Sequence, residues 1–135
     1  MKRNEKIPFL KALLCVAKAD SDTDITELSY YQTLGVEIGL GSDEVSNIQS
    51  AVLSGKETLE ENLDQIEERS TKLQLLYQMM ILACADGVIG EAEYQGIKGA
   101  ADHLNVEEDK VKEIVELVKE TEALKKKREQ ILESV

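Results

Sequence analysis

The sequence predicts an all-α fold of about seven helices, and three observations lead to this prediction. Apolar residues recur every three or four positions along most of the chain, which is the period of an amphipathic helix. Pro8 is the only proline among 135 residues, whereas folds rich in strands and turns use more. Hydrophobic residues make up 42% of the chain, enough for a buried core. We therefore expect a single domain spanning residues 1–135.

Three helices are predicted before residue 55. The first covers residues 8–19, because the fixed φ of Pro8 suits the first turn of a helix. The second follows Thr26, a candidate N-cap, and ends at the glycine-containing turn 39–41. Ser42 is a candidate N-cap for the third helix, which carries acidic residues in its first turn.

Four further helices complete the prediction. Residues 57–68 have a thin apolar face and form a connecting helix, after which Ser70 caps the most apolar segment, 73–85. The sixth helix covers residues 91–103 and is ended at Asn105, and the last helix begins among three acidic residues and covers 107–132. We expect the core to include Leu13, Leu14, Leu76, Met80 and Ile81.

The chain also repeats itself. Residues 17–20 and 83–86 both read Ala-x-Ala-Asp, and the pattern Ile-x-Glu-x-x-Tyr follows at 25–30 and 89–94. These matches predict two helix–loop–helix–turn–helix units with approximate two-fold symmetry, joined by the connecting helix. The predicted repeats span residues 8–53 and 71–120.

The charge of the chain argues against several classes of function. There are 27 acidic and 16 basic residues, which gives a net charge of −11. Such a surface repels nucleic acid and anionic lipid, and four tyrosines and one phenylalanine supply few platforms for stacking bases. We expect neither nucleic-acid binding nor membrane insertion; the charge favours cations or basic protein partners instead.

Carboxylates gather in the two loops that follow the repeated Ala-x-Ala-Asp. We call residues 20–27 the first acidic corner and residues 86–93 the second. Alternating aspartates can converge on a calcium or magnesium ion, but an EF-hand starting at Asp20 needs Gly and Glu where Ile25 and Tyr31 stand. Two interpretations are open: the carboxylates cap and solvate helix ends, or some of them bind a divalent cation. The candidate ligands are Asp20, Asp22, Asp24, Glu27, Asp86, Glu91 and Glu93.

No catalytic constellation is evident in the sequence. His103 is the only histidine and lies near a predicted helix end, and no phosphate-binding glycine loop or zinc-protease motif occurs. Cys15 and Cys84 lie in apolar runs without a CxxC partner, which is typical of buried reduced thiols. Together with the lack of a signal-peptide pattern, this predicts a cytoplasmic protein that is not an enzyme.

The second acidic corner resembles a known motif. Ala85, Asp86, Gly87, Ile89 and Glu93 after an apolar helix are similar to the signature of the tellurite-resistance TerB-like family, which includes the N-terminal domain of DjlA co-chaperones. The resemblance implies an all-α bacterial domain, linked to tellurite and other stress responses, whose acidic corner residues are proposed to chelate metal. Asp86 and Glu93 match the motif, and Asp20 matches as the aspartate of the first copy. Ser29 stands at the position aligned with Glu93, which is a departure from the family pattern.

Two functions follow as expectations. The first is a non-enzymatic TerB-like stress-response module that binds divalent cations, protein partners or both through its acidic corners. The second is a metal-free scaffold or adaptor that docks a basic partner on its acidic face. Four carboxylates in the first corner against three in the second make the first corner the stronger candidate for a cation.

Overall fold

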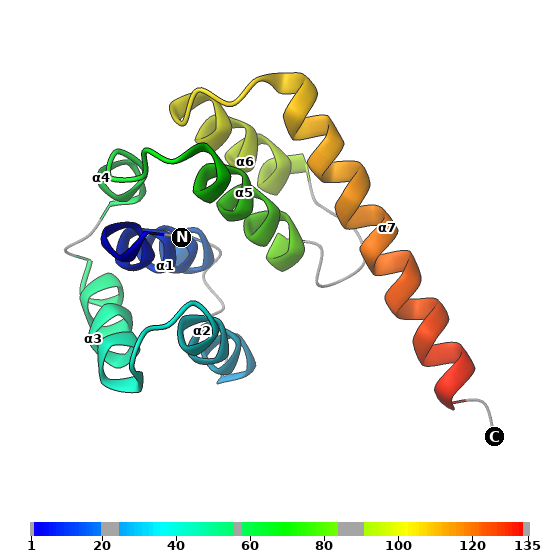
Figure 1. Ribbon diagram of the computed structural model, residues 1–135, viewed down its shortest axis with the longest axis horizontal. Helices are drawn as coiled ribbons and strands as arrows, with labels where there is room; N and C mark the ends of the chain where they lie inside the picture. Colours follow the sequence, from blue (N-terminus) through cyan, green and yellow to red (C-terminus); the bar gives the residue numbers. More distant parts are fainter. Residues whose placement is uncertain (1, 20–24, 56–57, 84–90, 134–135) are drawn as a thin grey trace. The chain divides into compact units, whose positions relative to one another are not determined.

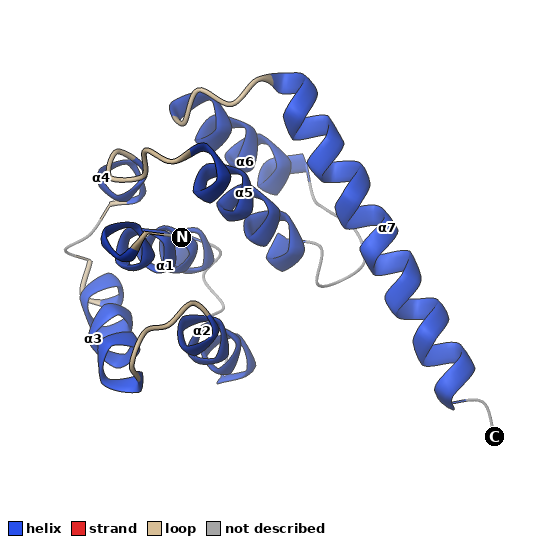
Figure 2. Cartoon of the chain, in the orientation of Figure 1, coloured by secondary structure: helices blue, strands red, loops and turns tan. Residues whose placement is uncertain are grey.

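A computed structural model describes residues 2–19, 25–55, 58–83 and 91–133. Every regular element within these ranges is a helix, as Figure 2 shows, which confirms the predicted all-α class and the number of helices. In chain order the helices are α1 (Arg3–Ala19), α2 (Ile25–Glu37), α3 (Ser42–Leu53), α4 (Leu59–Leu63), α5 (Arg69–Ala83), α6 (Glu91–His103) and α7 (Glu108–Glu133).

The chain divides into two compact units, Met1–Leu75 and Leu76–Val135. In the first unit α1 packs against α2, α3 and α4, and α2 also packs against α3 (Figure 1). Phe9, Leu10 and Val45 are at most 1% exposed in its core. Burial stabilises these helices, because the apolar side of each one is removed from water.

The second unit contains the last part of α5 together with α6 and α7, and α6 contacts α7 (Figure 1). Its buried side chains come from all three helices and include Met79, Ile97 and Val118. Among the predicted core residues of the whole chain, one is only half-buried, Ile81. The other four are confirmed as buried: Leu13, Leu14, Leu76 and Met80.

The helices recur at a constant interval of 66 residues. Arg3 and Arg69 begin α1 and α5, and the next two pairs of helices, α2 with α6 and α3 with α7, begin at the same interval. The buried positions repeat in this register too, as the pairs Phe9 and Leu75, Leu13 and Met79, Val45 and Val111, Ile48 and Ile114, and Val52 and Val118. The chain therefore contains two copies of one helical pattern without insertion or deletion between the helices; the predicted two-fold symmetry stays a prediction.

The first helix starts earlier than predicted. Pro8 is the sixth residue of α1 rather than its first, so the predicted start is wrong. At that position the ring removes a single hydrogen bond, the one to the carbonyl of Asn4, while Pro8 itself is buried. Glu5 in the same first turns is only 2% exposed, so packing extends the helix over residues that resemble a polar tail.

The connecting helix is shorter than predicted: α4 covers five residues instead of 57–68. After Leu63 the hydrogen bonds span three residues rather than four, as from the Ile66 amide to the Leu63 carbonyl at 3.1 Å. The next amides, those of Glu67 and Glu68, donate to the Glu5 carboxylate instead of continuing the helix. This competing acceptor explains why the helix ends.

The ends of α2 and α6 have the same geometry. The Leu40 amide donates to the Gly35 carbonyl and the Gly39 amide to the Val36 carbonyl, and Gly39 has a φ of +97°. After α6 the corresponding bonds go from Val106 to Ala101 and from Asn105 to Asp102, with a φ of +59° at Asn105. Both are Schellman caps, which confirms the turns predicted after residues 38 and 103.

The predicted N-caps are less accurate than the C-caps. Gly41 occupies the N-cap of α3 without a side-chain hydrogen bond, so Ser42 is the first helical residue. Thr26 and Ser70 are the second residues of their helices, not caps. Thr58, which begins the short α4, does cap with its side chain, accepting from the Glu61 amide.

Candidate functional site

The constant interval between the repeats aligns the two acidic corners. Each corner connects the first helix of a repeat to the second, α1 to α2 and α5 to α6. In this register Asp20 corresponds to Asp86, and Glu27 corresponds to Glu93. Both glutamates are the third residue of their helices. The counterpart of Glu93 is therefore Glu27 and not Ser29, so the first copy keeps the Asp-x₆-Glu spacing of the second.

The structure describes only part of the candidate site. The side chain of Glu91 is described; Glu27 and Glu93 are placed in α2 and α6, but their side chains are not. The remaining candidate ligands lie outside the described residues: Asp20, Asp22, Asp24 and Asp86. The prediction that these carboxylates converge on one ion stays a prediction.

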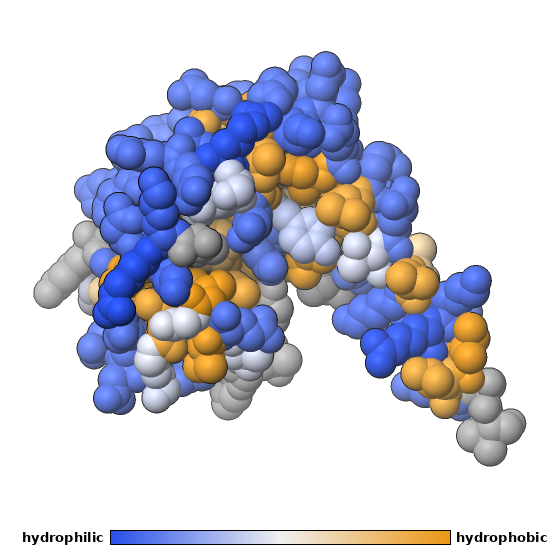
Figure 3. All heavy atoms as spheres, in the orientation of Figure 1, coloured by the Kyte–Doolittle hydropathy of each residue, from blue (hydrophilic) through white to orange (hydrophobic). Residues whose placement is uncertain are grey.

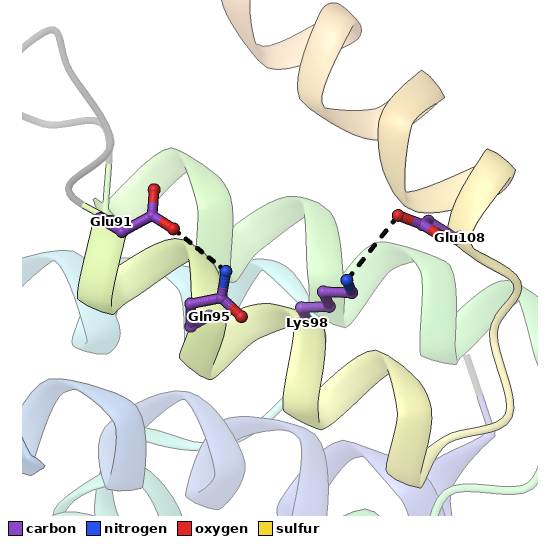
Figure 4. A network of polar contacts seen from close by, with 4 residues as sticks. All are labelled: Glu91, Gln95, Lys98 and Glu108. Carbon is purple, nitrogen blue, oxygen red and sulfur yellow. Dashed lines mark hydrogen bonds and ion pairs between the residues drawn. The ribbon is translucent and has the colours of Figure 1, made fainter.

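Glu91 is exposed at the first position of α6, and its carboxylate lies beside the next turn of the same helix. Its Oε1 accepts a hydrogen bond from Nε2 of Gln95 at 3.1 Å (Figure 4). A carboxylate in the first turn interacts favourably with the positive end of a helix. The contact with Gln95 joins two side chains one turn apart, and the carboxylate keeps a second oxygen for another ligand.

Farther along, α6 is tied to the start of α7 by an ion pair. Nζ of Lys98 lies 3.7 Å from Oε1 of Glu108, the first residue of α7 (Figure 4). Both side chains are more than a third exposed, so this pair contributes roughly 0–1 kcal/mol. The pair joins α6 to the start of α7 across the turn that contains Asn105.

Within the described ranges, no group of three or more His, Cys, Asp or Glu side chains is arranged to hold a metal ion. His103 is an exposed residue at the end of α6, and Cys15 is a half-buried thiol in α1. The expectation of a fully buried thiol is thus only partly met for Cys15, and Cys84 lies outside the described residues.

Among the described residues, Glu5 has the only buried carboxylate, and no pattern in the sequence singles it out. Oε2 of the buried Glu5 accepts hydrogen bonds from the backbone amides of Glu67 at 2.9 Å and Glu68 at 3.2 Å, just before α5. Burial raises the pKa of Glu5, but these two amides and the charge of Lys2 outweigh it and lower the pKa below its usual value. Glu5 is therefore a charged structural residue of the first unit.

Two buried oxygen atoms near this contact have no hydrogen-bond partner among the described residues. They are Oε1 of Glu5 and Oγ1 of Thr71, which is 1% exposed. The two residues occupy the same position in the two repeats, 66 residues apart. The first repeat thus has a charged acceptor where the second has a hydroxyl.

No helix among the described residues combines the length and apolar character needed to cross a bilayer. Comparison with known proteins yields no relative: no protein-family model, no curated protein and no solved structure matches this chain. The resemblance to the TerB-like family therefore rests on the motif of the second acidic corner and on its repetition in the first.

Proposed function

We propose that this protein is a non-enzymatic, TerB-like stress-response module that binds a divalent cation through its acidic corners. The observation that carries the proposal is the register of the repeats. Asp20 with Glu27, and Asp86 with Glu93, occupy equivalent positions before and within α2 and α6. The two equivalent loops of the chain thus share the carboxylate spacing that the resemblance associates with metal binding.

The first acidic corner is the stronger cation site in this proposal. Its Asp22 and Asp24 correspond, in the 66-residue register, to Val88 and Gly90 of the second corner. The first corner therefore has two carboxylates where the second offers no side-chain oxygen, while the second has Glu91 where the first has Ile25, so the count is four carboxylates against three. Since Ca²⁺ takes six to eight oxygen ligands and affinity rises with ligand charge, the higher count favours binding at the first corner.

The same proposal includes a bacterial, cytoplasmic setting. A thiol at Cys15, half-buried in a helix of an acidic protein, is compatible with a reducing compartment. A single histidine at an exposed helix end supports a binding role rather than catalysis.

Calorimetry and thermal unfolding with Ca²⁺, Mg²⁺, Mn²⁺ and Zn²⁺ test the proposal. We expect at least one ion to raise the melting temperature, since a ligand at about 100 times its Kd stabilises by about 2.7 kcal/mol. The variant Asp22→Asn with Asp24→Asn should melt at a higher temperature than the wild type without metal, because repulsion is relieved. It should also lose the response to the ion.

The matched control is Asp43→Asn with Asp109→Asn. These residues are exposed, occupy the second position of α3 and α7, and are equivalent in the repeat, so the change in net charge is the same. The control should keep the full response to the ion. If Asp86→Asn abolishes the response and the first-corner variant does not, the second corner is the site. If no ion shifts the melting temperature, the cation proposal is wrong and the adaptor alternative replaces it.

A further inference from the structure

The last helix continues well beyond the part that packs in the second unit. Its fully buried residues, Val111, Ile114 and Val118, all lie in the first eleven of its 26 positions. Thr121 is half-buried, and its hydroxyl lies 3.5 Å from that of Tyr77 on α5. From residue 123 to residue 133 every side chain is exposed. Figure 1 shows this orange-to-red part of α7 running past α6.

The exposed part of α7 carries an apolar stripe. Leu117, Leu124 and Ile131 follow one another at intervals of seven residues and are 50%, 68% and 62% exposed. Residues seven apart lie on one side of a helix, which is the repeat of a coiled-coil seam. At about 100° per residue the stripe is turned by roughly a third of a circle from the buried side of α7. Figure 3 shows apolar surface on this part of the helix.

The two parts of this helix differ in net charge. Residues 113–122 carry four acidic residues, Glu113, Glu116, Glu120 and Glu122, and one basic residue, Lys119. Residues 125–133 carry four consecutive basic residues, Lys125, Lys126, Lys127 and Arg128, followed by the acidic Glu129 and Glu133. Two such helices placed parallel would set the two acidic segments beside each other and the two basic segments beside each other, with Glu120 and Lys125 as a pair of opposite sign between them. Placed antiparallel, the acidic half of each would face the basic half of the other, which is the arrangement that electrostatic complementarity favours.

We propose that α7 pairs antiparallel with α7 of a second copy of this chain, forming a homodimer through the stripe. In this arrangement Leu124 meets its own counterpart at the two-fold axis, and Leu117 faces Ile131 of the second copy. Glu120 of one copy faces Lys127 of the other, and the two-fold axis makes this contact twice. The contact is isologous, so it closes at two copies and does not generate a filament.

The self-pairing also accounts for the length of α7. Isolated helices shorter than about 12–15 residues are marginal in water, and residues 123–133 of α7 are all exposed. A second copy of the chain supplies both the apolar cover and the opposite charges. This inference does not depend on cation binding at the acidic corners.

Sedimentation velocity across concentrations from about 1 μM to about 1 mM tests the proposal on the full chain. We expect a reversible monomer–dimer equilibrium. Leu124→Asn with Ile131→Asn should raise the dimer Kd at least tenfold without lowering the monomer's melting temperature. The matched control is Val36→Asn with Leu53→Asn, which changes two apolar residues of the first unit that are 55% and 51% exposed. The control should leave the Kd unchanged.

A charge exchange tests the antiparallel orientation. Glu120→Lys alone and Lys127→Glu alone should each raise the Kd several-fold at low salt, because each sets like charges opposite one another. The double exchange should restore the wild-type Kd, since the facing pairs are again opposite in sign. In a parallel dimer residue 120 lies close to residue 125 rather than 127, so the double exchange would not rescue binding.

Several outcomes would overturn the proposal. A chain that stays monomeric at the highest concentration has no such dimer. If, in addition, the Leu124→Asn and Ile131→Asn variant melts at a lower temperature, the stripe is covered by another part of the same chain. A dimer that the stripe variant leaves intact forms through a different surface. A dimer sensitive to the stripe variant but not rescued by the charge exchange excludes the antiparallel arrangement.

Discussion

Replacement of Glu5 by alanine should destabilise the protein by about 2–4 kcal/mol. The carboxylate accepts two backbone hydrogen bonds, from Glu67 and Glu68, and bonds to charged groups contribute roughly 1.5–3 kcal/mol each. We expect less than the roughly 3–6 kcal/mol that two such bonds would give, because Glu67 is exposed and Glu68 is half-buried, so that water replaces part of the lost interaction. At about 3 °C per kcal/mol the melting temperature should fall by at least about 6 °C.

The dependence on pH distinguishes the charge of Glu5 from its packing. Its pKa is lower in the folded protein than in the unfolded chain, so its stabilisation is fully present above the usual glutamate pKa. It is lost as the pH falls through the lowered folded pKa. The difference in unfolding free energy between wild type and Glu5→Gln should therefore be constant from about pH 7 to pH 5 and shrink below about pH 4.

Urea unfolding followed by circular dichroism at a series of pH values measures this difference. Glu60→Gln is the matched control, because Glu60 is an exposed glutamate of α4 in the same unit. It should change the stability by less than about 0.5 kcal/mol. The reasoning is refuted if Glu5→Ala unfolds within this margin of the wild type, or if the effect of Glu5→Gln does not depend on pH.

Two further predictions concern backbone positions. Gly35→Ala should destabilise by about 1–2 kcal/mol in thermal unfolding, because a Cβ there overlaps the buried Val45 side chain and comes within 3.3 Å of Leu10. The equivalent residue of the second repeat is Ala101. An unchanged melting temperature of the variant would show that the first unit also accommodates an alanine. Asn105→Gly should leave the free energy of unfolding unchanged or raise it slightly, whereas Asn105→Ala should lower it by about 1 kcal/mol, because the cap needs a positive φ at this residue. Equal stability of the two variants would contradict this.

The candidate site shows where a comparison within the sequence is ambiguous. Matching Ile25 with Ile89 aligns the corners by similar side chains and leaves Ser29 opposite Glu93. The helices and buried positions follow a constant interval instead, which pairs Glu93 with Glu27. The sequence could locate both acidic corners, because their Ala-x-Ala-Asp motifs are already in this register. The sequence alone could not decide whether Glu27 or Ser29 is the counterpart of Glu93, because that choice depends on which residues of the helices are buried.

Local signals in the sequence by themselves determined most of the helices. The apolar period and the acidic first turn predict α7, and the residues that tolerate a positive φ, Gly39 and Asn105, predict the ends of α2 and α6. These features need only neighbouring residues, because a helix cap satisfies amides and carbonyls within one or two turns.

Only the tertiary structure decided the features that depend on distant partners. Glu5 lies in a segment that reads as a charged tail, yet its carboxylate is buried against amides 62 and 63 residues away. That one contact extends α1 in front of Pro8 and ends the connecting helix early. A buried charge is stable only where donors replace water, and the position of those donors is set by the packing of α1 against α4 rather than by any local pattern.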